Sequence, residues 1–128
     1  MKGLFISGSG TDVGKTFIAQ HLVNLLTQSK IVSVRKPVES DCQVVNGDLV
    51  TKDALKLLKA SNVDNDIDIV CPYKFHHCSS AESASKASNV ELSLEIHSNF
   101  KRINKENMQT IFAILDGNIV NKQNKNVI

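Results

Sequence analysis

A glycine-rich run near the start of the chain has the residue types that bind phosphate. It reads Gly8-Ser9-Gly10-Thr11-Asp12-Val13-Gly14-Lys15-Thr16, after an apolar stretch and before a helical pattern. Backbone N–H groups of such a turn point at an anion, and the dipole of the following helix adds to that field. Lys15 would neutralise phosphate charge, and the Thr16 hydroxyl stands where such a loop offers a ligand to Mg²⁺. The pattern predicts a nucleoside triphosphate site.

The glycine spacing departs by one residue from the strict pattern G-x-x-x-x-G-K-[ST]. That pattern would place its first glycine at position 9, which is Ser9, whereas Gly8 lies one residue earlier. The alternative is a glycine-rich turn that only reverses a strand into a helix. Such a turn would explain neither Lys15 nor Thr16, so we favour the phosphate loop.

The loop, including its six-residue glycine spacing, resembles that of dethiobiotin synthetases, which reads Gly-Thr-Asp-Thr-Glu-Val-Gly-Lys-Thr or close variants. Lys36-Pro37-Val38-Glu39-Ser40 is similar to the family's Lys-Pro-Val followed by Ser, and Lys52-Asp53-Ala54-Leu55 to its Asp-Ala-Leu segment. Cys71-Pro72-Tyr73-Lys74-Phe75 and the segment 79–84 are similar to its Asn-Pro-Tyr-x-Phe and Ser-Pro-x-x-Ala stretches. The resemblance covers about the first half of the family fold, so we expect a short or truncated member.

The resemblance implies roles for individual residues. Lys15 and Lys36 would act on the transferred phosphate, Lys36 also on a carbamate, and Ser40 would contact a diamino acid substrate. Mg²⁺ ligands would be Thr16, Asp53 and Asp116, although the family has Glu-Gly-Ala-Gly-Gly where this chain has Asp116-Gly117-Asn118. The shorter Asp could bind the metal through water. Nucleotide contacts are expected from Gly8, Thr11, Asp12, Val13, Gly14, Lys15, Thr16, Phe17 and Asp53.

By the same resemblance, the protein is an ATP- and Mg²⁺-dependent ligase that forms the cyclic urea of dethiobiotin from 7,8-diaminononanoate and CO₂. One alternative is a nucleotide-binding remnant without turnover, because the segment 116–118 departs from the family pattern and the second half of the family fold is missing. Another is a zinc site at Cys71, His76, His77 and Cys78, although their spacing matches no standard zinc motif. Without the resemblance, Lys36 is a solvated cation and Asp53 a surface carboxylate.

Short apolar runs predict the strands that must carry these residues. We expect strands at 3–7, 31–34, 67–70 and 110–115, with Pro37 and Pro72 as breaks. Strands that alternate with helices predict an α/β fold, a P-loop NTPase-like parallel sheet with helices on both faces, incomplete relative to the family fold. Ligands bind at the carboxyl ends of such strands, and Lys36 would follow the strand beside the phosphate loop.

Apolar residues at helical spacing predict the helices between these strands. The first follows the loop and has the apolar positions Ile18, Leu22, Leu25 and Leu26. The second begins near Gly47 and Asp48 and has the apolar positions Leu49, Val50, Ala54, Leu57 and Leu58. A capping box from Ser79 to Glu82 begins the third, and Leu92, Ile96, Phe100 and Ile103 indicate a fourth.

Composition bounds the remaining possibilities. The 128 residues and 41% hydrophobic content predict one domain over 1–117, followed by an Asn- and Lys-rich tail over 118–128 that we expect to be disordered. A net charge of +2 does not suggest nucleic acid, and the longest apolar run, 111–115, is too short for a membrane span. Three cysteines, an odd number without the spacing of a disulfide-bonded secreted domain, predict reduced thiols and a cytoplasmic location. A homodimer is expected if the family's dimer surface is retained.

Overall fold

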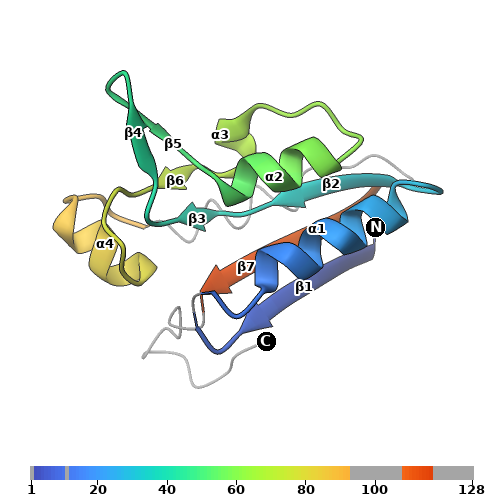
Figure 1. The fold of residues 1–128 in the computed structure, drawn as a ribbon, viewed down its shortest axis with the longest axis horizontal. Coiled ribbons are helices and arrows are strands. Elements are labelled where there is room, and N and C mark those ends of the chain that lie inside the picture. Colours follow the sequence, from blue (N-terminus) through green and yellow to red (C-terminus); the bar gives the residue numbers. More distant parts are fainter. Residues whose placement is uncertain (1, 11, 93–107, 117–128) are drawn as a thin grey trace.

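A computed structural model describes residues 2–10, 12–92 and 108–116 (Figure 1). The helices are α1 (Lys15–Leu26), α2 (Asp53–Ala60), α3 (Ile67–Val70) and α4 (Ala81–Ala87). The strands are β1 (Lys2–Gly8), β2 (Ile31–Arg35), β3 (Val38–Glu39), β4 (Gln43–Val45), β5 (Asp48–Val50), β6 (Tyr73–Lys74) and β7 (Met108–Asp116). No helix in these described ranges is long and apolar enough to cross a membrane.

The main sheet has the order β1-β7-β2, and both strand pairs are parallel. Because the three strands run parallel, their carboxyl ends point to the same edge of the sheet, although β2 ends opposite Phe112 while β1 continues to Gly8 opposite Asp116. This confirms a P-loop NTPase-like α/β fold with parallel strands at 2–8, 31–35 and 108–116. Strand β7 lies between β1 and β2, so the strand before Lys36 is not the direct neighbour of the strand before the glycine loop.

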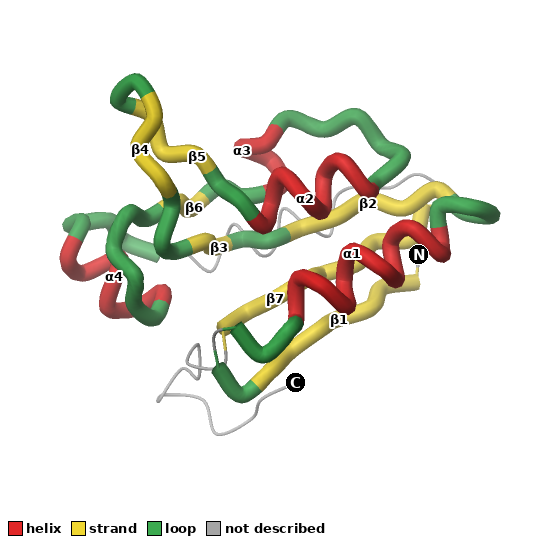
Figure 2. The backbone as a smooth tube through the Cα atoms, viewed as in Figure 1, coloured by secondary structure: helices red, strands yellow, loops and turns green. Residues whose placement is uncertain are grey.

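Helix α1 packs on the main sheet (Figures 1 and 2). Ala19 and Val23 are fully buried, and they share the core with residues of β2, α2 and α3. Leu22 and Leu26 pack partly against this core, but Ile18 and Leu25 are 52% and 61% exposed. The predicted apolar face is therefore wrong at Ile18 and Leu25, because the stripe at Ala19 and Val23 makes the contact.

The segment from Ile67 to Val70 is the helix α3, so the strand predicted there is wrong. The side chain of Asp66 caps this turn by accepting a hydrogen bond from the Asp68 amide at 2.9 Å. The pattern of a short apolar run is compatible with either a strand or a helix. Here the N-cap hydrogen bond of Asp66 stabilises the helix.

A β-hairpin occupies the predicted start of the second helix. Strands β4 and β5 pair antiparallel, with Val44 opposite Leu49, and Asn46 and Gly47 form the turn between them. Both turn residues have positive φ, 53° and 88°, which Asn and Gly adopt most readily in tight hairpins. The prediction that the helix begins near Gly47 and Asp48 is therefore wrong, and α2 begins at Asp53.

Helix α4 begins one residue later than the predicted capping box requires. Ser80 is the N-cap, and its Oγ accepts a hydrogen bond from the Ser83 amide at 3.3 Å. Glu82 pairs with Lys86 at 2.7 Å instead of capping the helix. Except for Leu92, the predicted helix over 92–103 lies outside the described residues, as do the tail over 118–128 and its boundary with the domain.

The position of this cap can be tested by comparing two neighbouring serines. Ser80→Ala removes the hydrogen bond to the α4 terminus and should lower the free energy of unfolding by about 1 kcal/mol. Ser79→Ala should change it by less than about 0.5 kcal/mol, the usual range for surface changes. Urea unfolding of both variants measures the difference, and a larger loss in Ser79→Ala would contradict the assignment.

Candidate functional site

The glycine loop connects the end of β1 to the first turn of α1. Gly8 permits a close contact, because a Cβ atom there would lie 2.9 Å from side-chain carbons of both Val13 and Lys15. Gly14 has φ 92°, a left-handed conformation that favours glycine, and its carbonyl accepts the Ile18 amide at 3.0 Å. The predicted loop thus opens α1 as expected, and Thr11 lies outside the described residues.

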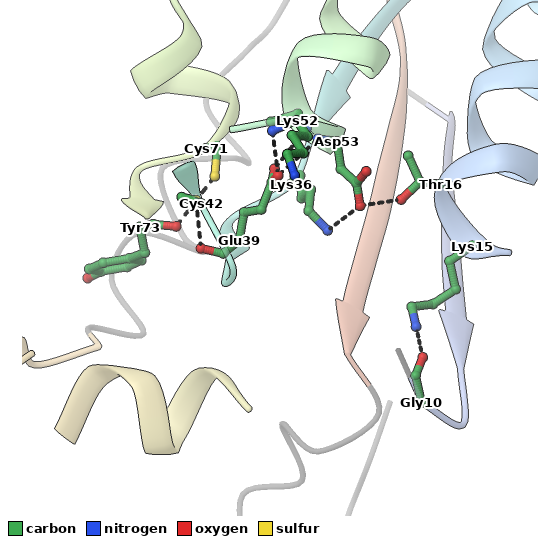
Figure 3. Close-up of polar contacts among 11 residues, drawn as sticks. Gly10, Lys15, Thr16, Lys36, Glu39, Cys42, Lys52, Asp53, Cys71 and Tyr73 are labelled. Carbon is green, nitrogen blue, oxygen red and sulfur yellow. Dashed lines mark hydrogen bonds and ion pairs between the residues drawn. The ribbon is translucent and has the colours of Figure 1, made fainter. Parts of the chain in front are cut away.

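Lys15 places a buried cation at this loop. The residue is only 7% exposed, and its Nζ donates a hydrogen bond to the Gly10 carbonyl on the other side of the loop (Figure 3). The ammonium group therefore lies over the loop backbone, where the helix dipole also concentrates positive potential. Both features favour an anion at this position.

Three predicted site residues meet beside the loop, although they come from separate elements (Figure 3). The Thr16 hydroxyl of α1 donates a hydrogen bond to Oδ2 of Asp53, the first residue of α2, at 2.7 Å. Lys36 Nζ, directly after β2, lies 3.7 Å from the same carboxylate oxygen. The Lys36 side chain is 6% exposed, so it is not the solvated cation of the alternative interpretation.

A pocket of about 450 Å³ connects the loop with this group, a volume typical of small-molecule sites. Most of the predicted residues line it, but Gly8 and Val13 do not. Sequence reasoning missed Glu39, Asp41 and Lys52, and it named Cys78 only in the zinc alternative. The complete lining is Asp12, Gly14, Lys15, Thr16, Phe17, Lys36, Glu39, Ser40, Asp41, Lys52, Asp53 and Cys78.

Glu39 is the most informative of the missed residues. It is 6% exposed, and its carboxylate accepts hydrogen bonds from the amides of Lys52, Asp53 and Ala54 at 2.7–2.9 Å. A Glu two residues after a Lys-Pro pair gives no local signal for this contact, because the amides lie 13 to 15 residues further along the chain.

Asp116 is the last residue of β7, and the strand register places it opposite Gly8. Its backbone therefore lies at the same edge of the sheet as the glycine loop. The residues that follow it are outside the described part of the chain, and its role as a metal ligand stays a prediction.

Comparison with known proteins agrees with this geometry. A family model described as an AAA domain matches residues 2–120. The ATP-dependent dethiobiotin synthetase BioD of Ruthia magnifica subsp. Calyptogena magnifica is 60% identical over 95 residues, 74% of this chain and 45% of that protein. The proteins of the same name from Vesicomyosocius okutanii subsp. Calyptogena okutanii and Idiomarina loihiensis are 61% and 43% identical, again over 74% of this chain.

The chain belongs to the dethiobiotin synthetase family. This confirms the resemblance carried by the glycine loop and the Lys36–Ser40 segment. The matched region spans a little under half the length of these relatives, between 43% and 45%.

The oxygen donors beside the loop suit the magnesium ion expected from the sequence. Thr16 Oγ1 and Asp53 Oδ2 lie 2.7 Å apart at the pocket, and Mg²⁺ prefers hydroxyl, carboxylate and phosphate oxygens. Within the described ranges, no group of three or more His, Cys, Asp or Glu side chains is placed to hold a metal. The zinc alternative at Cys71, His76, His77 and Cys78 therefore finds no support there.

The three cysteines are free, and their surroundings differ. Burial raises the pKa of the Cys71 thiol, and burial followed by the negative charge of Glu39 raises that of Cys42. Cys78 is exposed and lines the pocket. Because only a thiolate attacks a disulfide reagent, the two buried thiols are protected by their raised pKa as well as by poor access.

We therefore expect one fast-reacting thiol per folded chain at pH 8, assigned to Cys78. Titration with a chromogenic disulfide should show this single fast phase, and denaturant should expose all three thiols. Cys78→Ala should remove the fast phase. Its persistence in that variant would contradict the assignment.

Proposed function

We propose that this chain supplies the ATP-binding and phosphoryl-transfer part of a dethiobiotin synthetase, an ATP- and Mg²⁺-dependent ligase that acts on 7,8-diaminononanoate and CO₂. The observation that carries the proposal is the contact of Lys36 and Thr16 with one Asp53 carboxylate oxygen, 3.7 and 2.7 Å away, beside a glycine loop. The relatives named ATP-dependent dethiobiotin synthetase support the same activity.

In the proposed reaction, one substrate amine takes up CO₂ and loses a proton to give a carbamate. A carbamate oxygen then attacks the γ-phosphorus of ATP, and ADP leaves. The second amine attacks the carbon of this mixed anhydride and loses a proton, phosphate leaves, and the cyclic urea closes. Negative charge develops on oxygen atoms in each step, so fixed cations and N–H donors serve the reaction better than a protein nucleophile would.

The pocket residues suit these steps. The loop amides and Lys15 would bind the ATP phosphates, and the buried Lys36 would stabilise the charge that develops on the transferred phosphoryl group. Ser40, half-buried in the pocket lining, would contact the diamine. Thr16 and Asp53 would hold Mg²⁺, which neutralises phosphate charge when bound. Homodimer formation and a cytoplasmic location stay predictions from the family and the composition.

Lys36 separates binding from turnover in this proposal. Lys36→Ala should lower turnover by at least about a hundredfold, as expected for the loss of one preorganised charge partner. ATP affinity should change far less, because the loop amides and Lys15 would make most of the contacts that bind the ATP phosphates. Lys56→Ala, on the exposed side of α2, is the matched control and should leave turnover unchanged.

Turnover is measured as phosphate released from ATP and Mg²⁺ with diaminononanoate and bicarbonate, and affinity by calorimetry. Equal turnover in Lys36→Ala and wild type would contradict the role of Lys36. ATP binding without turnover in the wild type would instead favour a nucleotide-binding remnant.

A further inference from the structure

Helix α2 has no N-terminal cap of its own. Its N-cap residue is Lys52, whose side chain makes no capping hydrogen bond. The preceding residue, Thr51, could cap a helix by its type, yet its hydroxyl is buried and has no hydrogen-bond partner in the structure described here. The first amides of a helix lack partners within the helix, so another group must accept from them.

Glu39 supplies that group from a different part of the fold (Figure 3). Its Oε1 accepts from the amides of Lys52 and Asp53 at 2.7 and 2.9 Å, and its Oε2 accepts from that of Ala54 at 2.9 Å. A carboxylate at a helix N-terminus also interacts favourably with the helix dipole. Hydrogen bonds to a charged group with so little solvent exposure are strong ones.

Glu39 itself is held in place by its backbone. It is the last residue of β3, which pairs parallel with β6, and its carbonyl accepts the Phe75 amide at 2.9 Å. The carboxylate therefore acts from a fixed strand onto the start of α2. It also closes the base of the β4–β5 hairpin, because Glu39 and Lys52 flank the segment that contains it.

The residue so held is Asp53, whose amide binds Glu39 and whose carboxylate contacts Thr16 and Lys36. We propose that Glu39 is a positioning residue that fixes the Asp53 carboxylate against Thr16 and Lys36 and so sets the affinity of the site for Mg²⁺ bound with ATP. The inference rests on the proposed function for its ligand. The contact between Glu39 and α2 can be measured without any ligand.

The test has one measurement in the free protein and one with nucleotide. In Glu39→Ala, amide hydrogen exchange at Lys52, Asp53 and Ala54 should be at least about tenfold faster than in the wild type. The Mg²⁺ concentration that gives half-maximal enhancement of ATP binding should rise by about 10- to 100-fold, the usual cost of losing a group that orients a metal ligand. ATP affinity without Mg²⁺ should change far less.

Two variants control for general damage to the fold. Thr51→Val changes an equally buried residue at the same helix end but removes no hydrogen bond, so exchange and Mg²⁺ dependence should both match the wild type. Glu39→Gln keeps one acceptor oxygen of similar placement and should give an intermediate effect on both. If Glu39→Ala fails to fold, the comparison of Glu39→Gln with Thr51→Val decides the question.

Unchanged exchange and unchanged Mg²⁺ dependence in Glu39→Ala would overturn the proposal. It would also be overturned if the Mg²⁺ dependence stayed the same while the diamine concentration needed for turnover rose, because Glu39 would then be a substrate ligand. If the wild-type chain binds no ATP, the proposed function fails, and the exchange measurement still decides whether Glu39 fixes the start of α2.

Discussion

One carboxylate oxygen of Asp53 connects the elements on which the site depends. It accepts the Thr16 hydroxyl from the first turn of α1 and faces the Lys36 ammonium at the end of β2. The glycine loop, the main sheet and α2 are therefore joined at a partly buried polar contact beside the pocket. A metal-bound triphosphate requires this combination, because its oxygens need cations, N–H donors and a metal held by hard oxygen ligands at the same place.

The architecture around that oxygen brings together groups that are distant in the sequence. Parallel strands in the order β1-β7-β2 place the ends of β1 and β2 at one edge of the sheet, with Gly8 and Asp116 opposite each other in the register. The fully buried Ala19 and Val23 let α1 pack closely against the core that β2 and α2 share. Glu39 then fixes the first amides of α2, so that Asp53 has a defined position relative to Thr16.

The sequence predicted the parts of the fold that depend on short-range patterns. The strand at 31–34, the apolar run at 110–115 and the glycine loop before α1 carry enough local information to be located. The resemblance brought Lys36 and Asp53 into one site although 17 residues separate them. The parts that failed depend on tertiary context or on a turn that was overlooked. The pair Asn46-Gly47 is typical of a tight β-hairpin and could have predicted the turn. The burial of Ala19 instead of Ile18 depends on the elements that α1 packs against.

Glu39 shows most clearly why sequence reasoning is incomplete at the site. Its type and position are compatible with an exposed strand end, and only the fold shows that three amides at the start of α2, including that of the N-cap residue, donate to it. The same holds for Asp66, whose capping of α3 turned a strand-like apolar run into a helix. In both cases an acidic side chain satisfies helix amides, which hydrophobic periodicity does not report.

The most direct test of a metal–nucleotide site between Thr16 and Asp53 is an NMR titration of the folded chain with Mn²⁺ and ATP. Mn²⁺ is paramagnetic and takes the same oxygen ligands as Mg²⁺. A site there predicts that the amide signals of Thr16 and Asp53 broaden at the lowest Mn²⁺ concentrations, and that those of Leu26 and Lys59, toward the far ends of α1 and α2, broaden only later in the titration. Sharp Thr16 and Asp53 signals, with broadening centred elsewhere in the chain, would contradict it.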